Sequence, residues 1–419
     1  MNLNHYSLKR VLYITYDGLT DPLGQSQILP YLQHLSNEGY QFTILSFEKK
    51  ERFKKEASVI HEIVKASGLL WMPLFFTYKP PILSKMYDRY QMKKTALALQ
   101  QQNNFDLVHC RSYIAAETGL LLKEKFGVKM LFDMRGFWAD EKVDNGQWNL
   151  QKPLFKRIYT FYKKKEKAFL QKADGIVSLT QAAKDYLLEK PEYSRLSIKV
   201  IPCCADLDHF NFNRITPGEI IKKKAALGIP SDAKIITYLG SVGGWYMTEE
   251  MFRFFALLVE QHSEWVMLFL TKDDPDLVKN QAAFAGIPSH KIFITYSNRK
   301  ELPLYLAMCS CSVFFIRNSF SKIASSPTKH AELMGMGIPV ICNDIGDTGE
   351  IISSTKTGLI INEFDTDHYR KAVANIIALE QIDKSYIRQH AREIFDLQKG
   401  VQLYSALYAD ILKPVTAVA

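Results

Sequence analysis

The stretch 325-SSPTKHAELMGMGIPVI-341 predicts a polar loop, a short helix, a Gly-Ile-Pro turn and a buried strand. Ser326 is expected to cap the helix, and Pro327 to occupy its first position, where a missing N–H costs nothing. The free N–H groups of such a helix start attract phosphate, and Lys329 adds a positive charge beside them. The segment therefore indicates an anion site at the start of a helix.

Glu332 follows Lys329 by three residues, so the two side chains project from one face of the helix. A carboxylate at this position can accept hydrogen bonds from the hydroxyls of a ribose. Together with the phosphate cradle, it predicts a site for a nucleotide sugar. The alternative is an ordinary capped helix with a Lys–Glu pair on its surface.

The same segment resembles the donor-site motif of the retaining glycosyltransferases of family 4, which have the GT-B fold. That motif is a Glu-x7-Glu pattern followed by a Gly-x-Pro-Val turn. Glu332 matches the second glutamate, which holds the ribose in the family, whereas the first would fall at Ala324. In this departure the chain resembles the branch of the family that carries a Ser-Pro-Thr/Ser-Lys loop. The departure leaves open which group contacts the donor sugar.

The length of 419 residues predicts two domains. Residues 1–205 are expected to form an acceptor-side domain and residues 206–395 a nucleotide-sugar-binding domain, with 206–218 as the linker. The resemblance implies that 396–419 forms a helix that crosses back to the first domain.

Short apolar strands alternate with helical patterns through both halves, which is typical of parallel βαβ units. The expected class is α/β: a GT-B fold of two Rossmann-like doubly wound domains facing across a cleft, with ligands at the carboxyl ends of the strands. The predicted strands are 11–15, 42–47, 106–109, 129–132, 176–179, 199–201, 235–239, 266–270, 292–295, 312–315, 340–342 and 359–361.

Compartment signals are few. Residues 1–10 are polar and lack a signal-peptide pattern, and the longest apolar patches, such as 69–76, are far shorter than a membrane span. The 6 cysteines are scattered without zinc-site spacing, so reduced core thiols and a cytoplasmic protein are expected.

The net charge of +9 is concentrated in places, notably 152–172, where lysines and arginines alternate with aromatic residues. This pattern predicts a basic amphipathic helix against an anionic membrane surface. Phe161, Tyr162 and Phe169 are expected to enter the headgroup layer, with the lysines of 163–167 above them.

A second basic segment, 80–94, carries similar apolar neighbours. Nucleic acid would attract such charge, but no base-reading module is recognisable, so no nucleic-acid partner is expected. The alternative for both segments is a solvated helix with an ordinary core face.

Three loops of the first half follow strands and carry polar residues. The first, 16–27, contains Gly24 and Gln25, and glycine permits close backbone approach to a ligand. The alternative is a surface turn. The second contains His109 and Arg111, where a structural strand-end histidine competes with a catalytic one.

The third loop contains Asp133, Arg135 and Trp138. Burying charged side chains just after the end of a strand costs free energy unless they face a polar site, and this loop carries two acids, an arginine and a tryptophan. The loop resembles the Arg-Asp-Leu-Trp-Pro variant found in transferases that act on lipid-linked sugars. The resemblance implies catalytic roles for Asp133 and Arg135 and acceptor-side roles for Gly24, Gln25, His109, Arg111 and Trp138.

In the second half, the small residues of 240–244 allow backbone N–H groups to reach a phosphate. The cations Arg317, Lys322 and Lys329 are candidates to balance the diphosphate charge, with Lys329 and Arg317 as catalytic residues. Acids at 273–276 are expected to cap a helix rather than bind a metal. The donor-binding candidates are Glu332, Ser325, Ser326, Thr328, Gly240, Ser241, Arg299, Gly346 and Asp347.

The expected activity is transfer of a hexose-type sugar from a nucleotide diphosphate sugar to an acceptor, with retention. The basic aromatic surface favours a lipid-linked sugar or a surface-polysaccharide precursor as acceptor. The resemblance implies that neither a metal nor a cofactor is needed. Two alternatives stay open: a GT-B epimerase acting on a nucleotide sugar, and a non-catalytic protein that binds one.

Overall fold

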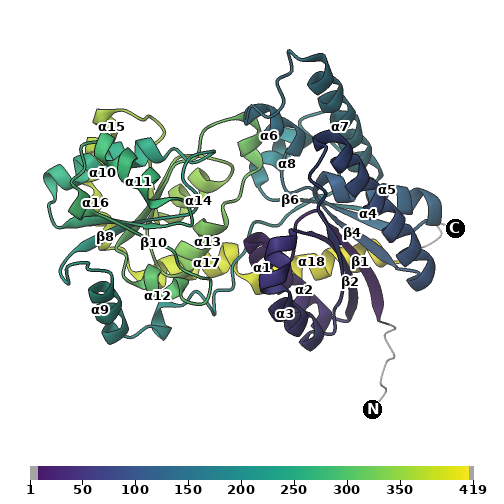
Figure 1. Ribbon diagram of the computed structural model, residues 1–419, viewed down its shortest axis with the longest axis horizontal. Helices are drawn as coiled ribbons and strands as arrows, with labels where there is room; N and C mark the ends of the chain where they lie inside the picture. The colour runs from purple at the N-terminus through teal and green to yellow at the C-terminus, as the bar shows by residue number, and fades with distance from the viewer. Residues whose placement is uncertain (1–7, 415–419) are drawn as a thin grey trace. The chain divides into compact units, whose positions relative to one another are not determined.

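The computed structural model describes residues 8–414. The chain forms two compact units (Figure 1). The first contains the chain up to Pro202 together with the segment that begins at Leu397, and the second is Cys203–Asp396. The chain therefore leaves its first unit once and returns to it.

The first unit is built on a sheet of seven strands in the order β3-β2-β1-β4-β5-β6-β7, and all neighbouring strands are parallel. The order reverses between β1 and β4, and in a doubly wound sheet the loops at such a switch point form the binding site. The strands are β1 (Lys9–Thr15), β2 (Tyr40–Glu48), β3 (Leu70–Phe75), β4 (Leu107–Arg111), β5 (Lys129–Asp133), β6 (Gly175–Ser178) and β7 (Ile198–Val200).

Helices cover this sheet. The returning helix α18 packs against α2, and α5 packs against both α4 and α7. Gly127 ends α5 with a left-handed φ of 70°, a conformation that suits glycine. The helices are α1 (Pro22–Gln27), α2 (Leu29–Asn37), α3 (Lys50–Ala66), α4 (Pro81–Asn103), α5 (Ser112–Phe126), α6 (Trp138–Asp144), α7 (Pro153–Lys172), α8 (Gln181–Leu188) and α18 (Leu397–Leu412).

The second unit repeats the topology with six parallel strands in the order β10-β9-β8-β11-β12-β13. Its switch point lies between β8 and β11. The strands are β8 (Lys234–Leu239), β9 (Trp265–Leu270), β10 (Ile292–Thr295), β11 (Cys311–Phe314), β12 (Val340–Cys342) and β13 (Gly358–Ile360). The helices are α9 (Pro217–Ala226), α10 (Thr248–Gln261), α11 (Pro275–Phe284), α12 (Leu302–Ala307), α13 (Thr328–Gly335), α14 (Thr348–Thr355), α15 (Thr366–Ala374), α16 (Ile376–Glu380) and α17 (Lys384–Phe395).

The central strands are buried on both faces. Every residue of β9, with the sequence WVMLFL, is buried. Continuous apolar runs of this kind are typical of parallel strands covered by helices on both sides. The prediction of two Rossmann-like sheets is therefore confirmed, and the six cysteines are buried and form no disulfide, as predicted.

Three sequence predictions about the elements were wrong or incomplete. Helix α3 and edge strand β3 were not predicted, because β3 lacks a clear alternation and its residues are only partly buried. Segment 206–218 is not a free linker, since Leu207 and Phe210 are buried in the core of the second unit. The Arg388 guanidinium donates to the backbone carbonyls of Leu207, Phe210 and Gly335, which ties this segment to α13.

No helix in residues 8–414 is long and apolar enough to cross a membrane.

Candidate active site

Lys329 lies in the first turn of α13 and is buried, with 8% of its surface exposed. Its Nζ lies 3.6 Å from the ring centroid of Tyr246 and 4.5 Å from that of Tyr238. Within the described residues it has no hydrogen-bond partner. Burial lowers the pKa of Lys329 to about 7, against a smaller opposing effect of Glu332. An unpaired, buried ammonium is costly unless a ligand supplies the counter-charge.

The loop after β8 faces this ammonium. Gly240 has φ 137°, and a Cβ atom added there would lie 2.6 Å from Lys329 Nζ, so only glycine fits. Gly243 and Gly244 also have positive φ, of 75° and 63°. Asp273 fixes the loop, because its Oδ2 accepts the N–H of Val242 at 2.5 Å. Successive backbone N–H groups in such a turn form an anion-binding concavity.

Asp273 had been considered only as a metal ligand or a helix cap. Asp274 does cap α11, accepting the N–H of Asp276 at 3.0 Å, as predicted. In residues 8–414, no group of three or more His, Cys, Asp or Glu side chains could hold a metal ion. The acid at the end of β9 thus supports the glycine loop.

Glu332 lies one turn after Lys329 and is buried, with 6% exposed. Its Oε1 lies 3.0 Å from Nη1 of Arg299, whose guanidinium carbon lies 5.2 Å from the ring centroid of Phe210. Burial raises the pKa of the Glu332 carboxyl, although Arg299 opposes the rise. The pair offers a carboxylate next to an aromatic ring, a combination that suits a ribose and its base.

The prediction for Ser326 was wrong. Helix α13 begins at Thr328 with Pro327 as N-cap and without a side-chain cap. The hydroxyl oxygen of Ser326 instead accepts the N–H of Cys203 at 3.1 Å, which joins the loop to the first residue of the second unit. Ser325 precedes it at the end of a short 3-10 turn, where its N–H donates to the Lys322 carbonyl.

The remaining predicted cations of this unit differ in position. Arg317 is exposed at the end of β11, and its Nη2 donates to the Gly244 carbonyl at 3.1 Å. Lys322 is buried, with Nζ 3.8 Å from the ring centroid of Trp245. Both therefore touch the same glycine loop as Lys329. Gly346, with φ 59°, and Asp347, the N-cap of α14, lie after β12.

In the first unit, the carboxyl ends of β4 and β5 bring charged side chains together around Asp133, which is 1% exposed. Its Oδ2 lies 3.8 Å from Nη1 of Arg111 and 3.9 Å from Nη1 of Arg135. Burial opposes ionisation, but Arg135, His109 and Arg111 outweigh it and lower the pKa of Asp133. Oδ1 of Asp133 has no hydrogen-bond partner among the described residues. It is a buried acceptor that no described residue satisfies.

Arg135 has a left-handed backbone with φ 59°, which is uncommon for a residue other than glycine. Strain of this kind is found where a loop is held in one shape for binding or catalysis. Arg111 is buried and its Nε lies 3.3 Å from Asp17, which follows β1. The cluster therefore spans the switch point of the sheet.

His109 is enclosed by the same cluster. Its Nδ1 lies 2.6 Å from the Tyr408 hydroxyl and its Nε2 lies 3.5 Å from Asp133 Oδ2. Burial lowers the pKa of His109, so the ring is neutral. An ionised Asp133 accepts from Nε2–H, and Tyr408 then donates to Nδ1. Because both ring nitrogens are occupied, the geometry matches the structural alternative, in which His109 positions Asp133.

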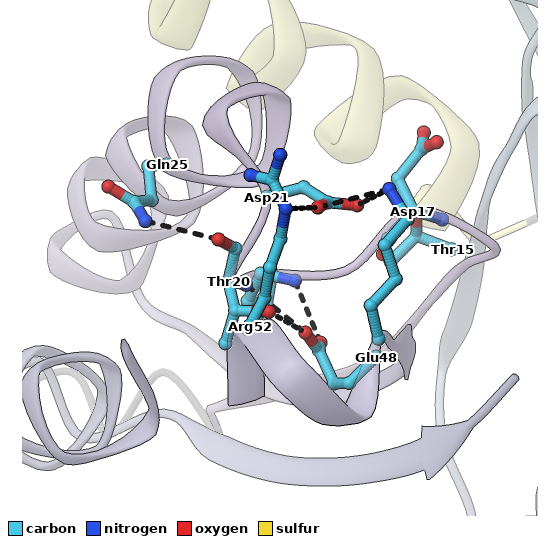
Figure 2. Close-up of polar contacts among 9 residues, drawn as sticks. Thr15, Asp17, Thr20, Asp21, Gln25, Glu48 and Arg52 are labelled. Atoms are coloured by element: carbon cyan, nitrogen blue, oxygen red, sulfur yellow. Dashed lines mark hydrogen bonds and ion pairs between the residues drawn. The ribbon is translucent and has the colours of Figure 1, made fainter. Parts of the chain in front are cut away.

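The loop after β1 is held by Glu48, a residue that the sequence predictions missed. The buried carboxylate accepts the N–H of Leu19 at 2.8 Å and the hydroxyl of Thr20 at 2.6 Å (Figure 2). It also accepts the Thr20 N–H at 3.2 Å and the Ser46 hydroxyl at 2.6 Å. The available signal was an acid at the end of an otherwise largely apolar strand.

Gly24 and Gln25 stabilise this loop from α1. A Cβ atom at position 24 would lie 2.1 Å from the Gly18 carbonyl oxygen, so the close approach that glycine permits is within the loop. The Gln25 side-chain amide donates to the Thr20 carbonyl at 3.3 Å (Figure 2). Both residues therefore shape the loop, and the Gln25 side chain is tied to it.

Trp138 lies apart from the Asp133 cluster, at the start of α6. Its ring packs against Tyr162, with centroids 4.8 Å apart, and against Trp148 at 5.4 Å. These rings line a pocket of about 700 Å³ between α4, α6 and α7.

The predicted membrane face of α7 was wrong in part. Tyr162 is 7% exposed and Phe169 is 0% exposed, so only Phe161 of the three faces solvent. Lys163 is half-buried and its Nζ lies 2.8 Å from Asp140 and 2.5 Å from Glu166. Helix α7 turns these residues toward α5 and α6, because one face of the helix is needed to cover the sheet.

Comparisons with known proteins agree with this arrangement. Two family models match the chain: Glycosyltransferase Family 4 over residues 27–209 and Glycosyl transferases group 1 over residues 219–393. A glycosyltransferase from Rickettsia africae superposes with a TM-score of 0.70 at 17% identity, covering 97% of this chain and 100% of that chain. Anabaena HepE in complex with UDP and glucose superposes with a TM-score of 0.67 at 12% identity, covering 95% of this chain and 99% of that chain.

The fold is thus GT-B, the two-domain architecture of nucleotide-sugar-dependent enzymes. The chain belongs to glycosyltransferase family 4. D-inositol 3-phosphate glycosyltransferase of Saccharomonospora viridis is 21% identical over 71% of this chain and 67% of its own length. The same enzyme of Rhodococcus jostii is 21% identical over 67% of this chain, and the match spans 60% of its length, less than two thirds.

Proposed function

We propose that this glycosyltransferase moves a hexose-type sugar from a nucleotide diphosphate sugar to an acceptor, with retention of the anomeric configuration. The observation that carries the proposal is the unpartnered, buried Lys329 beside the Gly240 loop. Such a group is paired only when an anion arrives, and the diphosphate of a donor is an anion of the right kind.

The donor is assigned to the second unit. The diphosphate binds to Lys329, to the N–H groups of the Gly240 loop and to the N–H groups at the start of α13. Glu332 accepts hydrogen bonds from the ribose hydroxyls. Charge grows on the leaving diphosphate as the glycosidic bond breaks, and a preorganised cation stabilises that charge more in the transition state than in the ground state. Arg317 is placed to contribute through the same loop. No metal or cofactor is invoked for this step.

The acceptor is assigned to the first unit. The unpartnered Oδ1 of Asp133 is a hydrogen-bond acceptor for an incoming hydroxyl, and Arg135 and Arg111 keep this carboxylate ionised. Because Asp133 is assigned to the acceptor hydroxyl, the proposal invokes no covalent intermediate between the sugar and the protein. Front-face attack, in which the acceptor hydroxyl enters on the side from which the diphosphate leaves, accounts for retention.

A lipid-linked sugar or surface-polysaccharide precursor is the proposed acceptor, and a cytoplasmic protein at the inner face of a membrane the proposed location. The basic, exposed residues of α7 and the exposed apolar residues of α4 support this part of the proposal. A water-soluble acceptor would need neither feature.

The direct test is a thermal-shift screen of UDP-, GDP-, ADP- and TDP-linked hexoses, followed by transfer assays with the donor that binds. A ligand at 100 times its Kd raises stability by about 2.7 kcal/mol, which is readily measured. Absence of a shift with every donor and with the free diphosphates would contradict the proposal. Proton NMR of the first-formed product decides between retention and inversion, and an EDTA arm tests the metal requirement.

The same assays separate the alternatives. An epimerase would convert free donor with no acceptor present. A non-catalytic binding protein would bind donor and neither transfer nor hydrolyse it. Sugar transfer that requires added acceptor excludes both.

A further inference from the structure

The pocket between α4, α6 and α7, which we call the α4–α7 pocket, has no role in the steps above. Its volume is about 700 Å³, within the usual range for ligand sites. Aromatic rings form much of its wall, since Trp138, Trp148 and Tyr162 pack against one another. Two further lining residues, Tyr16 and Gln147, are neutral and polar, and the others are apolar or cationic: Ile82, Lys85, Met86, Arg89, Ile114, Lys142, Phe155, Arg157, Ile158 and Phe161.

No acidic residue lines this pocket, while four cations do. Arg89 is neutralised by Glu117, at 2.6 Å. Lys142 lies 3.0 Å from the neutral Gln147 amide oxygen, and burial lowers its pKa, although Glu141 opposes the fall. Lys85 lies 3.9 Å from Asp88. Arg157 is exposed and has no ion pair among the described residues, so it is the cation of this pocket that the fold leaves unbalanced.

A shallower basic hollow adjoins the pocket on α7 and shares Arg157 and Phe161 with it. Lys156 and Lys164 complete its positive charge, and neither has an acidic partner in the described part of the chain. Apolar surface continues on the other side: Ile82, Leu83 and Met86 of α4 are 52%, 61% and 57% exposed. Large exposed apolar patches next to a groove mark binding surfaces.

We propose that the α4–α7 pocket binds the hydrocarbon chain of a lipid diphosphate, with its phosphates at Lys156, Arg157 and Lys164. The juxtaposition of an aromatic pocket, a basic hollow and an exposed apolar rim fits one amphiphilic molecule better than a peptide, because every charged lining residue is positive and Gln147 is the single amide side chain among the lining residues. The inference rests on the proposed transfer function, and it names the acceptor as a single-chain lipid diphosphate sugar. A bulk membrane surface or a protein partner is an outcome of the test.

The test is calorimetric titration of the full-length chain with farnesyl diphosphate below its micellar concentration, alongside farnesol and inorganic diphosphate. Saturable binding of farnesyl diphosphate, at least tenfold tighter than either fragment, is expected. Ile82→Glu places a carboxylate at the pocket and should weaken binding at least tenfold, as should Arg157→Glu at the hollow. The matched control is Ile221→Glu, at an exposed helical isoleucine of the second unit (63% exposed), which should bind as the parent does.

Equal binding by the Ile82→Glu and Ile221→Glu variants, or no binding by the parent, would overturn the pocket assignment. So would attachment to anionic vesicles that neither farnesyl diphosphate nor Ile82→Glu reduces, since the surface would then serve a bilayer and not one chain. Nucleotide binding by the second unit is measured in parallel. If the donor binds and its sugar is transferred to a soluble sugar while farnesyl diphosphate does not bind, the pocket assignment is wrong and the transferase function stands. If farnesyl diphosphate binds but no nucleotide does, the pocket assignment stands and the proposed transferase function is wrong.

Discussion

Lys329 joins two opposing requirements in one side chain. It is buried among Tyr238, Tyr246 and Phe314, yet the role proposed for it at a diphosphate requires it to be charged. Under this proposal, charging Lys329 costs free energy in the free protein, and a bound anion would remove that cost. Such sites are expected to be less stable than the surrounding core and to gain stability on binding.

The pH dependence of this cost has a definite sign. Burial lowers the pKa of Lys329 to about 7, below its usual value, so the unfolded chain binds more protons than the folded one between that pH and about 10.5. The free energy of unfolding therefore falls as pH drops through this window. Lys329→Met should raise the free energy of unfolding at pH 6 by a few kcal/mol, on the order of 3, and much less at pH 10. Urea unfolding at the two pH values measures the difference, and an equal change at both would contradict it.

Diphosphate binding should also draw a proton onto Lys329. At pH 8 the free side chain is mostly neutral, and a bound diphosphate favours its charged form. Titration of UDP in buffers with different ionisation enthalpies should reveal proton uptake that approaches one per nucleotide and is absent in Lys329→Met. If UDP does not bind, GDP or ADP replaces it. Proton uptake that persists in the variant would assign it to another group.

Lys329→Ala should lower turnover more than nucleotide affinity, because its charge opposes one that grows during bond cleavage. A rate at saturating donor within a factor of about two of the parent, under 0.5 kcal/mol, would show that Lys329 is not catalytic. Lys300→Ala, at an exposed position in the same unit, is the control.

Glu332→Gln tests the ribose assignment. The variant would lose two hydrogen bonds from the ribose hydroxyls to a charged acceptor, so its affinity for the nucleotide should fall about 10- to 100-fold. Arg299 would lose its ionic partner but remains partly solvated. Glu301→Gln, at an exposed position in the same unit, is the matched control. Calorimetric titration compares the three proteins, and equal affinity would remove Glu332 from the donor site.

At the scale of the element, the loop after β1 depends on one strand-end carboxylate. Glu48→Gln replaces an acceptor of four hydrogen bonds with a group that must also donate, so the loop should loosen and stability should fall by about 1–3 kcal/mol. Transfer to acceptor should fall further, whereas the nucleotide-induced thermal shift should persist. Glu62→Gln, exposed on α3, is the control; an unchanged transfer rate in Glu48→Gln would separate this loop from the acceptor site.

Helix α7 carries the proposed membrane contact through Lys164, one of the predicted lysines, together with Lys156 and Arg157, which lie earlier on the helix. Since Lys163 is paired, the charge open to anionic lipid lies on Lys156, Arg157 and Lys164. Replacing these three with Gln should weaken attachment to anionic vesicles about 100-fold, at roughly 1 kcal/mol per charge. The control with the same charge change replaces Lys222, Lys356 and Lys371, exposed in the second unit.

Flotation with anionic and neutral vesicles at low and high salt compares the proteins, because screening shortens to about 10 Å at 0.1 M salt. If the parent ignores anionic vesicles at low salt, α7 is a solvated helix and a soluble acceptor becomes the better proposal.

At the scale of the whole molecule, the first unit is completed by the end of the chain. Helix α18 buries Val401, Tyr404 and Tyr408, and Tyr408 is hydrogen-bonded to His109 beside Asp133. A chain that ends at Asp396 should therefore lose the folding transition of the first unit, because three large side chains contribute about 5–9 kcal/mol, comparable to the stability of a domain. The second unit should still unfold cooperatively and bind nucleotide.

Calorimetry compares the unfolding transitions of three chains: the one that ends at Asp396, the full chain, and one that ends at Lys413. The longer truncation keeps α18 and should retain both transitions. A normal first transition without α18 would show that the unit folds independently of it.

The sequence by itself determined the class of each unit. Continuous apolar runs such as that of β9, separated by helical patterns, can be satisfied only by covered parallel strands, and the loops at the ends of such strands are the natural places for Asp133 and Gly240. The relation of Lys329 to Glu332 follows from helix geometry alone. These features are local, so the residues that decide them are neighbours in the chain.

The tertiary structure decided the partners of the buried polar groups. That Ser326 accepts from Cys203, that Glu48 holds Leu19 and Thr20, and that Asp273 fixes the Gly240 loop could not be read from spacing. The same is true of the burial of Tyr162 on α7. Local periodicity tells which face of an element is buried, whereas the hydrogen-bond partner of a buried polar atom depends on which distant segment the fold brings within about 3 Å of it.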